Sequence, residues 1–251
     1  MSLLVPAQVG AQLYTVRKYT ENEIDLRETL RRIAEIGYKS VQLSAVAAME
    51  GDNPQVTAEM FKDMLQTYHL FCPGAHNSLA ALKANPDAEI AKLKTIGCHT
   101  VAIAWVDPKI VESPQLSSEF IKDATEMQKI FTQAGIKLAI HNHAHDAKFA
   151  DKLVSETDLA FEVDVFWIAK AGLDPAQVIA KHPGKVSLIH LKDRPINGAE
   201  GFAAVGEGDL DFTSIIENAK IAGTKDFIVE QDTCPRDEFD CLRSSFVYLT
   251  Q

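Results

Sequence analysis

The chain has 251 residues, 46% of them hydrophobic and 24% charged, which is ordinary for a globular protein with a sizeable core. Its formal net charge of -10, without any stripe of interleaved basic and aromatic residues, argues against nucleic acid as a partner. Because the sequence has no apolar run of about 18 residues, no basic-flanked leader and no Cys-x-x-Cys pair among its four cysteines, we expect a reduced, cytoplasmic protein with no membrane partner.

Short apolar runs alternate with longer amphipathic runs along the whole chain. The apolar runs predict strands, in chain order, over 8–14, 40–45, 71–76, 99–106, 137–143, 159–164, 186–193 and 226–232. The amphipathic runs predict helices over 26–37, 57–70, 87–97, 116–135, 175–182, 212–222 and 235–249. Glycine, which readily takes the left-handed conformation at a helix end, closes four of these helices: Gly37, Gly97, Gly135 and Gly223.

The alternation of strands and helices predicts parallel pairing of the strands. Eight such units in 251 residues fit a closed (β/α)8 TIM barrel, an α/β fold that forms a single domain over 1–251. An open, doubly wound sheet with extra strands is the alternative. Neither G-x-G-x-x-G nor G-x-x-x-x-G-K-[ST] follows the first predicted strand, so the commonest reason for an open nucleotide-binding sheet is missing.

Polar residues end the fifth to eighth apolar runs, at the edge where a parallel barrel gathers the carboxyl ends of its strands. They are His141, Asp164, His190 and Glu230. Two imidazoles and two carboxylates form a plausible ligand set for one divalent metal ion, with oxygen favouring Mn²⁺ or Mg²⁺ and imidazole favouring Zn²⁺, Co²⁺ or Fe²⁺. As alternatives, Asp164 could cap the next helix, and Glu230 could pair with Arg236 or Lys192.

The segment KLAIHNHAHD, residues 137–146, places histidines at every second position. His141, His143 and His145 therefore begin on one side of an extended chain. We expect His141 to bind metal at the strand end, and His143 to contact substrate or to act as acid or base where the chain leaves the sheet. His145 is expected on the solvent side of the loop. His76, at the end of the third strand, is a further predicted substrate contact.

The loop after the seventh strand, HLKDRPINGAEGFAAVGEGDLDF (190–212), carries more candidates. Lys192 is placed to polarise a carbonyl or to bind an oxyanion, and we expect Arg194 and Glu207 to contact substrate with it. In the alternative interpretation, Lys192 pairs with Asp193 or Glu207, and VGEGDLDF is a glycine-rich turn that leads into a helix.

Taken in series, six segments resemble the sugar phosphate isomerase/epimerase family, the xylose isomerase-like (β/α)8 barrels that also include endonuclease IV. They are VGAQLYTVR (9–17), AIHNHAHDAKF (139–149), FEVDVFWIAKAGLDP (161–175), IHLKD (189–193), AVGEGDLDF (204–212) and IVEQD (228–232). Many members bind one divalent ion, often Mn²⁺, through side chains on strands five to eight. The resemblance therefore implies Mn²⁺, with Zn²⁺, Co²⁺ or Mg²⁺ as alternatives, at His141, Asp164, His190 and Glu230.

Three positions depart from the patterns of this family. His141 stands where the ketose 3-epimerases carry one of the two glutamates that act as acid and base, and it is similar to an HNH subgroup that is close to inosose dehydratases. Trp167 stands where epimerases often have histidine, which removes a candidate ligand and leaves Trp167 as a predicted substrate contact. Lys148 stands where HNH relatives often carry glutamate. The resemblance to endonuclease IV is poor, because its additional zinc ligands have no counterparts.

Together these residues predict a metal-dependent isomerase or epimerase of a small sugar or polyol with a carbonyl next to a carbinol. The metal and Lys192 would stabilise an enediolate after Glu230 or His143 removes a proton. Loss of a β-hydroxyl from the same intermediate would instead make the protein a dehydratase, that is, a lyase. A barrel that binds sugar without turnover is the alternative from another class, because position 141 lacks the carboxylate. Acidic charge disfavours phosphodiester hydrolysis, and the pattern favours no particular oligomeric state.

Overall fold

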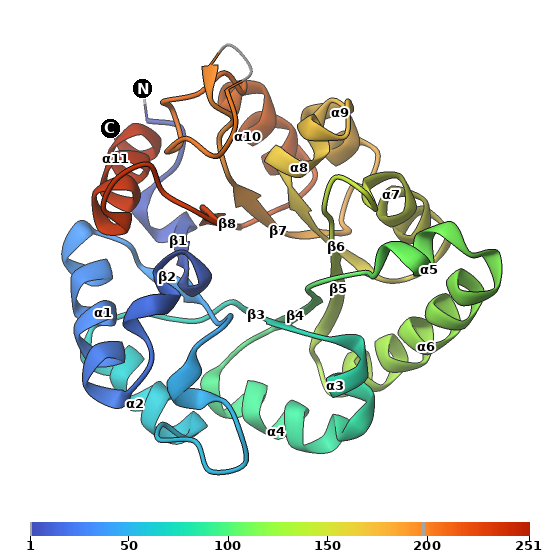
Figure 1. The fold of residues 1–251 in the computed structure, drawn as a ribbon, viewed down its shortest axis with the longest axis horizontal. Coiled ribbons are helices and arrows are strands. Elements are labelled where there is room, and N and C mark those ends of the chain that lie inside the picture. Colours follow the sequence, from blue (N-terminus) through green and yellow to red (C-terminus); the bar gives the residue numbers. More distant parts are fainter. Residues whose placement is uncertain (1, 197–198) are drawn as a thin grey trace.

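Eight parallel strands form the centre of the computed structural model, which describes residues 2–196 and 199–251 (Figure 1). The strands are β1 Val9–Gln12, β2 Ser40–Gln42, β3 Gly74–Asn77, β4 Thr100–Ile103, β5 Lys137–His141, β6 Ala160–Asp164, β7 Val186–Leu191 and β8 Asp226–Val229. Their order in the sheet is β2-β1-β8-β7-β6-β5-β4-β3, and neighbours in this order pair in parallel. Each strand overlaps one of the predicted apolar runs.

The two end strands of this order, β2 and β3, come together and close the barrel. Leu43 and Ala75 form an isolated parallel bridge between them. His76 N donates to Leu43 O at 2.9 Å, and Leu43 N donates to Gly74 O at 3.1 Å. The sheet is therefore nearly closed on itself, which confirms the predicted (β/α)8 barrel, and the open, doubly wound alternative is wrong.

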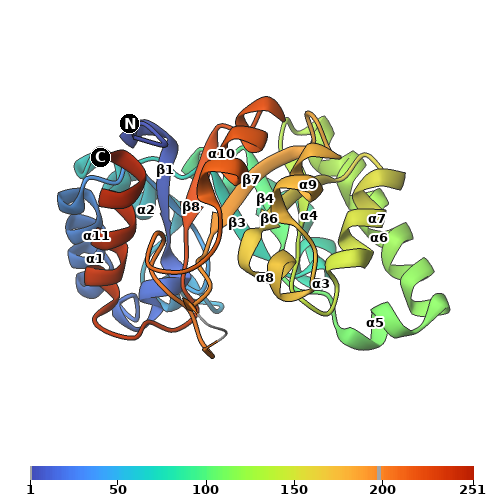
Figure 2. The same ribbon diagram turned by 90° about the horizontal axis from the view of Figure 1, so that it is seen from above.

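Helices surround the strands on the outside of the barrel (Figures 1 and 2). Those that overlap predicted helices are α1 Glu23–Ile36, α2 Ala58–Thr67, α4 Pro86–Ile96, α6 Pro114–Gln133, α9 Pro175–Ala180, α10 Phe212–Ile221 and α11 Glu238–Thr250. The sequence did not predict α3 Leu79–Ala84, α5 Pro108–Glu112, α7 Ala147–Glu156, α8 Val165–Lys170, or the 3-10 turns Pro6–Gln8, Leu13–Tyr19 and Ala47–Met49. Among the described residues, every helix is too short or too polar to cross a membrane.

Helix α1 illustrates how local sequence sets the ends of these elements. The side chain of Asn22 caps its first turn by accepting a hydrogen bond from Asp25 N at 3.0 Å. Leu26 and Leu30, one turn apart, are fully buried in the hydrophobic core. Gly37 ends the helix with a φ of 123°, and the other predicted helix-end glycines also have positive φ: Gly97 at 95°, Gly135 at 81° and Gly223 at 90°.

Polar side chains occupy the interior of the barrel near the carboxyl ends of the strands, where branched apolar residues are the usual filling. On β6, Glu162 and Asp164 share one face because side chains alternate along a strand, and both are fully buried. Phe161 and Val163, on the opposite face, pack into the hydrophobic core. The residues two positions before His141 on β5 and Glu162 on β6 are the alanines Ala139 and Ala160. With Ala102 on the neighbouring strand β4, they form a separate small apolar cluster.

Candidate functional site

A cavity of about 240 Å³ opens at the carboxyl ends of the strands, where side chains from several strands of such a barrel meet. It is lined by Tyr14, Ser44, His76, Ala104, Trp105, His141, His143, Lys192, Glu230 and Asp232. Five of these were predicted from the sequence as ligands, catalytic groups or substrate contacts: His76, His141, His143, Lys192 and Glu230. The barrel therefore brings residues from widely separated segments to one small, polar space.

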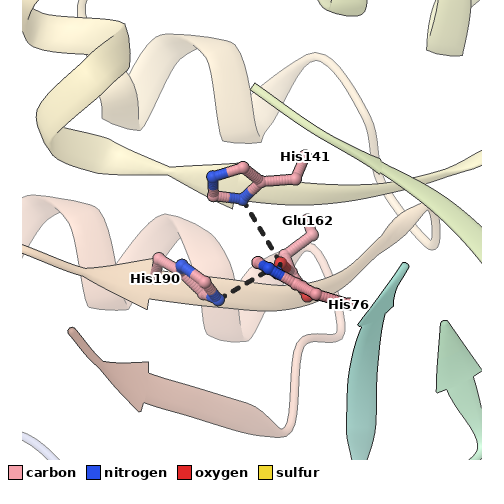
Figure 3. Close-up of side chains that lie close together, drawn as sticks. All are labelled: His76, His141, Glu162 and His190. Atoms are coloured by element: carbon pink, nitrogen blue, oxygen red, sulfur yellow. Dashed lines mark hydrogen bonds and ion pairs between the residues drawn. The ribbon is translucent and has the colours of Figure 1, made fainter. Parts of the chain in front are cut away.

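Three imidazole rings meet one buried carboxylate beside this cavity, and we call His76, His141, Glu162 and His190 the histidine cluster (Figure 3). Glu162 Oε1 lies 3.2 Å from His141 Nδ1 and 3.1 Å from His190 Nε2. The same oxygen contacts His76 Nε2. A single carboxylate oxygen thus faces a ring nitrogen from each of β3, β5 and β7.

Amide side chains from β1 and β2 hold the carboxylate of Glu162 in place. Gln42 Nε2 donates to Glu162 Oε2 at 2.6 Å, and Gln12 Nε2 donates to Gln42 Oε1 at 2.9 Å. Gln42 Oε1 also lies 2.6 Å from His190 Nε2. Because one oxygen of Glu162 is fixed by Gln42, the other is left to face the imidazoles.

The electrostatics of the cluster give His141 and His190 different protonation states. Burial lowers the pKa of His141 to about 3, although Glu162 opposes this shift. Burial also disfavours the charged form of His190, but Glu162 and Glu230 outweigh it and raise its pKa to about 10. The three rings around Glu162 overcome its desolvation and hold its pKa well below the ordinary range. At neutral pH, His141 is therefore neutral and His190 is an imidazolium paired with carboxylates.

The raised pKa of His190 predicts that the metal-free protein loses stability in mild alkali. A histidine whose pKa rises from 6.5 to about 10 on folding stabilises the folded state fully below pH 6.5 and loses this contribution as the pH rises through 10. We expect the free energy of unfolding to fall by about 3–4 kcal/mol between about pH 7 and pH 10. Urea unfolding in the presence of a chelator at both pH values measures this difference.

Two histidine variants make this measurement specific. His190→Asn should flatten the fall, while His182→Asn, which alters another buried histidine that pairs with Asp151 at 2.7 Å, should keep it. An equal pH dependence in the wild-type protein and in His190→Asn would show that another group is responsible.

A buried lysine forms the second polar group, and we call Asp164, Lys192, Glu230 and Asp232 the lysine cluster. Lys192 Nζ lies 3.0 Å from Asp164 Oδ2, 2.9 Å from Glu230 Oε2 and 2.6 Å from Asp232 Oδ1, and its side chain is 1% exposed. Asp164 also caps α8, because its Oδ1 accepts a hydrogen bond from Trp167 N at 3.0 Å. The capping alternative for Asp164 and the Lys192 alternative for Glu230 are thus both observed.

The ammonium sets the charge states of its neighbours. Burial raises the pKa of Asp164 to about 6, although Lys192 opposes this shift. Burial acts in the same direction on Glu230, but Lys192 and His190 overcome it and hold its pKa well below the ordinary range. The three surrounding carboxylates likewise overcome desolvation and raise the pKa of Lys192. A stable carboxylate and a stable ammonium therefore stand side by side in the cavity wall.

The structure divides the four predicted metal ligands between the two clusters. Asp164, His190 and Glu230 offer ligand atoms that all lie within 4.8 Å of one another, whereas His141 groups in this way with the rest of the histidine cluster. His190 belongs to both groups, because its Nδ1 lies 2.7 Å from Glu230 Oε2 and its Nε2 lies 3.1 Å from Glu162 Oε1. A cluster of histidine and carboxylate groups that could bind a metal is therefore present, in two overlapping forms.

Of the other two histidines in residues 137–146, His143 lines the cavity and His145 does not. The ring of His143 lies 4.6 Å from that of Trp105, and burial, with His141 and Lys192 nearby, lowers the pKa of His143 to about 2. His145 is exposed, as expected for the solvent side of the loop, and its Nε2 bonds to the carbonyl of Val106 at 2.8 Å.

Two predicted substrate contacts lie apart from the residues that line the cavity. Arg194 pairs with Asp209 at 2.8 Å, and Glu207 pairs with Arg236 at 2.6 Å and accepts a hydrogen bond from Ser244. These partners hold both side chains at the protein surface, so neither meets Lys192. Trp167, a third predicted contact, lies beside the cavity with its ring 5.6 Å from that of His143.

The segment VGEGDLDF acts as a glycine-rich turn. The carboxylate of Asp193 accepts hydrogen bonds from the backbone N–H groups of Gly206 at 3.0 Å and Gly208 at 2.8 Å. Asp211 then caps α10 by accepting from Ser214 N at 3.1 Å. The turn interpretation is therefore correct, and Asp193 fixes the turn rather than pairing with Lys192.

Several site residues were not identified from the sequence. Glu162 lies two positions before Asp164, so the two-residue period of a strand already placed it on the same face. Gln12 and Gln42 end their strands as His141 does, but uncharged amides gave no signal of a ligand or catalyst. Asp232 lies two residues after Glu230, so the two-residue period of a strand likewise placed it on the same face as a predicted site residue.

Comparison with known proteins gives the family and the fold. A model of the family described as xylose isomerase-like TIM barrel matches residues 30–241. No curated protein matches the chain. The following solved structures share the fold at low sequence identity.

A sugar phosphate isomerase/epimerase from Parabacteroides distasonis ATCC 8503 superposes with a TM-score of 0.80 at 18% identity, over 99% of this chain and 95% of that chain. An L-ribulose 3-epimerase superposes with a TM-score of 0.73 at 14% identity, over 97% and 93% of the two chains. The IolI protein with a bound zinc atom superposes with a TM-score of 0.71 at 15% identity, over 96% of each chain.

The family match and the barrel agree with the motifs quoted from the sequence. The matched residues begin in α1 and end in α11, and so include every strand from β2 to β8. The resemblance to xylose isomerase-like barrels is thereby confirmed. The chain belongs to the xylose isomerase-like TIM barrel family.

Proposed function

We propose that this protein is an isomerase or epimerase of a small sugar or polyol ketone, and that it works through an enediolate with the help of one divalent metal ion. One observation carries the proposal. Lys192, Glu230 and His143 line one cavity directly beside a buried group of imidazoles and a carboxylate. A cation, an anion and a neutral base in one wall are the groups that proton transfer next to a carbonyl requires.

The size and polarity of the cavity suit such a substrate. Its volume of about 240 Å³ lies below the roughly 300–1,000 Å³ of pockets that take drug-sized ligands. Its wall offers hydroxyl, imidazole, carboxylate and ammonium groups, which can hydrogen-bond the several hydroxyls of a sugar. The aromatic side chain of Trp105 adds an apolar face at this wall.

Each polar group has a distinct role in this proposal. The ammonium of Lys192 stabilises negative charge on the carbonyl oxygen as the enediolate forms. Glu230, an ionised carboxylate in the cavity wall, accepts the proton from the neighbouring carbon. His143, a neutral imidazole whose Nδ1 is buried without a hydrogen-bond partner among the described residues, is the second candidate for this proton transfer.

A divalent ion would supply Lewis-acid polarisation of the carbonyl and hydroxyl oxygens of the substrate. The four ligands predicted from the sequence fit it incompletely. The ammonium of Lys192 already contacts both Asp164 and Glu230, and His141 Nδ1 faces Glu162. We therefore assign no step to an ion held by those four residues.

Exchange of a substrate proton with solvent tests the proposed reaction. The protein, supplied in turn with Mn²⁺, Zn²⁺ or Co²⁺, is incubated in D2O with a panel of ketoses and inososes, and deuterium next to the carbonyl is followed by NMR. We expect incorporation into at least one substrate, and its loss when a chelator removes the ion. Saturable sugar binding without exchange under all three ions would contradict the proposal and favour a non-catalytic barrel.

A further inference from the structure

The geometry around Glu162 resembles a coordination shell. Two ligands on a tetrahedral Zn²⁺ with bonds of about 2.0–2.1 Å lie about 3.3 Å apart. Glu162 Oε1 is 3.2 Å from His141 Nδ1 and 3.1 Å from His190 Nε2, and it also contacts His76 Nε2. The four ligand atoms all lie within 4.8 Å of one another (Figure 3). They therefore have the spacing of donors that could share one ion.

A buried nitrogen at this place lacks a well-aligned hydrogen bond. His141 Nδ1 lies 3.2 Å from Glu162 Oε1 but makes no hydrogen bond within the described residues, and the side chain is only 3% exposed. Figure 3 shows this nitrogen directed toward the Glu162 carboxylate. An unpartnered buried nitrogen is costly, because burial removes its hydrogen bonds to water. Coordination to an ion would satisfy it.

Outer contacts orient the ligands as they do in established metal sites. A histidine that binds metal through one ring nitrogen usually donates the other to a carboxylate, and His190 Nδ1 lies 2.7 Å from Glu230 Oε2. Gln42 Nε2 donates to Glu162 Oε2 at 2.6 Å, which fixes the carboxylate. If an ion binds His190 Nε2, Gln42 Oε1 loses its contact with that nitrogen. Gln42 Oε1 still accepts a hydrogen bond from Gln12 Nε2 at 2.9 Å.

The alternative place, between Asp164 and Glu230, already has a cation. Lys192 Nζ lies 3.0 Å from Asp164 Oδ2 and 2.9 Å from Glu230 Oε2, so a divalent ion there would face an ammonium at close range. Within the part of the chain that the structure describes, Glu162 forms ion pairs with the three histidines and with no lysine or arginine. Two of its members, His76 and His141, line the cavity and give an ion a route of entry from solvent.

From these contacts we infer that the metal centre of this protein is the histidine cluster, with His76, His141, Glu162 and His190 as ligands. Three imidazole nitrogens and one carboxylate oxygen favour Zn²⁺ or Co²⁺ over the harder Mn²⁺ and Mg²⁺. The catalytic role of the ion rests on the proposed function, whereas the experiment below measures only metal binding.

The experiment compares two carboxylates on the same strand. Wild-type protein, Glu162→Gln and Asp164→Asn are stripped of metal and titrated with Zn²⁺ against a chromophoric chelator, and with Co²⁺ in visible absorption. Both variants replace a fully buried carboxylate on β6 by its amide, so each is a matched control for the other. His76→Asn, at the partly exposed ligand, provides a second test if Glu162→Gln does not fold. Circular dichroism checks folding.

We expect one ion per chain in the wild-type protein, with the visible absorption of four-coordinate Co²⁺. Glu162→Gln and His76→Asn should weaken Zn²⁺ binding by more than about 100-fold, the upper end of what loss of an outer partner costs, and Asp164→Asn by less than about 10-fold. Equal or greater loss in Asp164→Asn would overturn the assignment, as would wild-type affinity no higher than that of Glu162→Gln. The expected binding pattern in a protein without proton exchange would contradict the proposed function while supporting this site.

Discussion

Lys192→Met is expected to lower the rate of substrate proton exchange by about 10²–10³-fold, the loss seen when one donor to a developing oxyanion is removed. The same change should lower the free energy of unfolding by about 3–5 kcal/mol, because it removes one partner of a buried ion pair. Methionine keeps much of the length and volume of the side chain. Both effects therefore follow from the missing charge.

The size of the stability effect comes from the burial of the lysine cluster. Lys192 is 1% exposed and contacts Asp164, Glu230 and Asp232, so its loss leaves three carboxylates facing one another with little water between them. Chemical unfolding near neutral pH measures the loss. Lowering the pH should recover part of it, since Asp164, with a pKa already raised to about 6, takes up a proton most easily.

Lys170→Met is the matched control. Lys170 Nζ lies 5.1 Å from the ring of Trp167, much as Lys192 Nζ lies 5.5 Å from it, but Lys170 is exposed to solvent. Removing its charge should change neither exchange nor stability appreciably. Unchanged exchange in Lys192→Met would show that the ammonium does not act on the substrate, even if stability fell as expected.

The barrel could be predicted from the sequence because its strands and helices differ in hydrophobic period and are separated by glycines. Two of the missed helices differ in how clearly the sequence shows them. Helix α7 has this helical period, because Ala147, Ala150, Leu153 and Val154 are buried on one face, and it could have been predicted. Helix α8 begins at Val165, directly after β6 ends at Asp164, so no loop in the sequence separates the strand from the helix.

The site was predictable in its residue types but not in its pairings. The strand ends that carry His141, Asp164, His190 and Glu230 do meet at one mouth, as the topology of a parallel barrel requires. Which of them contact one another depends on the depth of each side chain and on partners far away in the chain. Gln42 contacts Glu162 across 120 positions, and His76 reaches the same carboxylate across 86.

The ion-pair partners of Lys192 also could not be predicted from the sequence. Sequence proximity suggested Asp193 or Glu207 as the partner of Lys192, but the next side chain along a strand points to the opposite face. Asp193 therefore turns away from Lys192 and binds the backbone of the glycine-rich turn. The partners of Lys192 come instead from the ends of β6 and β8, which flank β7 in the sheet.

Glu230→Gln is expected to lower the rate of proton exchange by about 10²–10⁴-fold, the usual contribution of a positioned general base. The amide keeps the shape of the side chain but cannot accept the proton as a carboxylate does. Glu230 is 4% exposed, and Lys192 and His190 lower its pKa, so its side chain is an ionised carboxylate at every pH near neutral. Deuterium incorporation at saturating substrate measures the chemical step.

Asp232→Asn separates loss of the base from loss of a charge beside Lys192. Asp232 also lines the cavity and also contacts Lys192, at 2.6 Å, but its side chain is 28% exposed. If Glu230 is the base, Asp232→Asn should retain exchange within about 10-fold, below the range expected for loss of a base. The reverse order of the two variants would assign proton transfer to Asp232. Full exchange in both, with loss in His143→Asn, would assign it to the imidazole whose Nδ1 has no hydrogen-bond partner among the described residues.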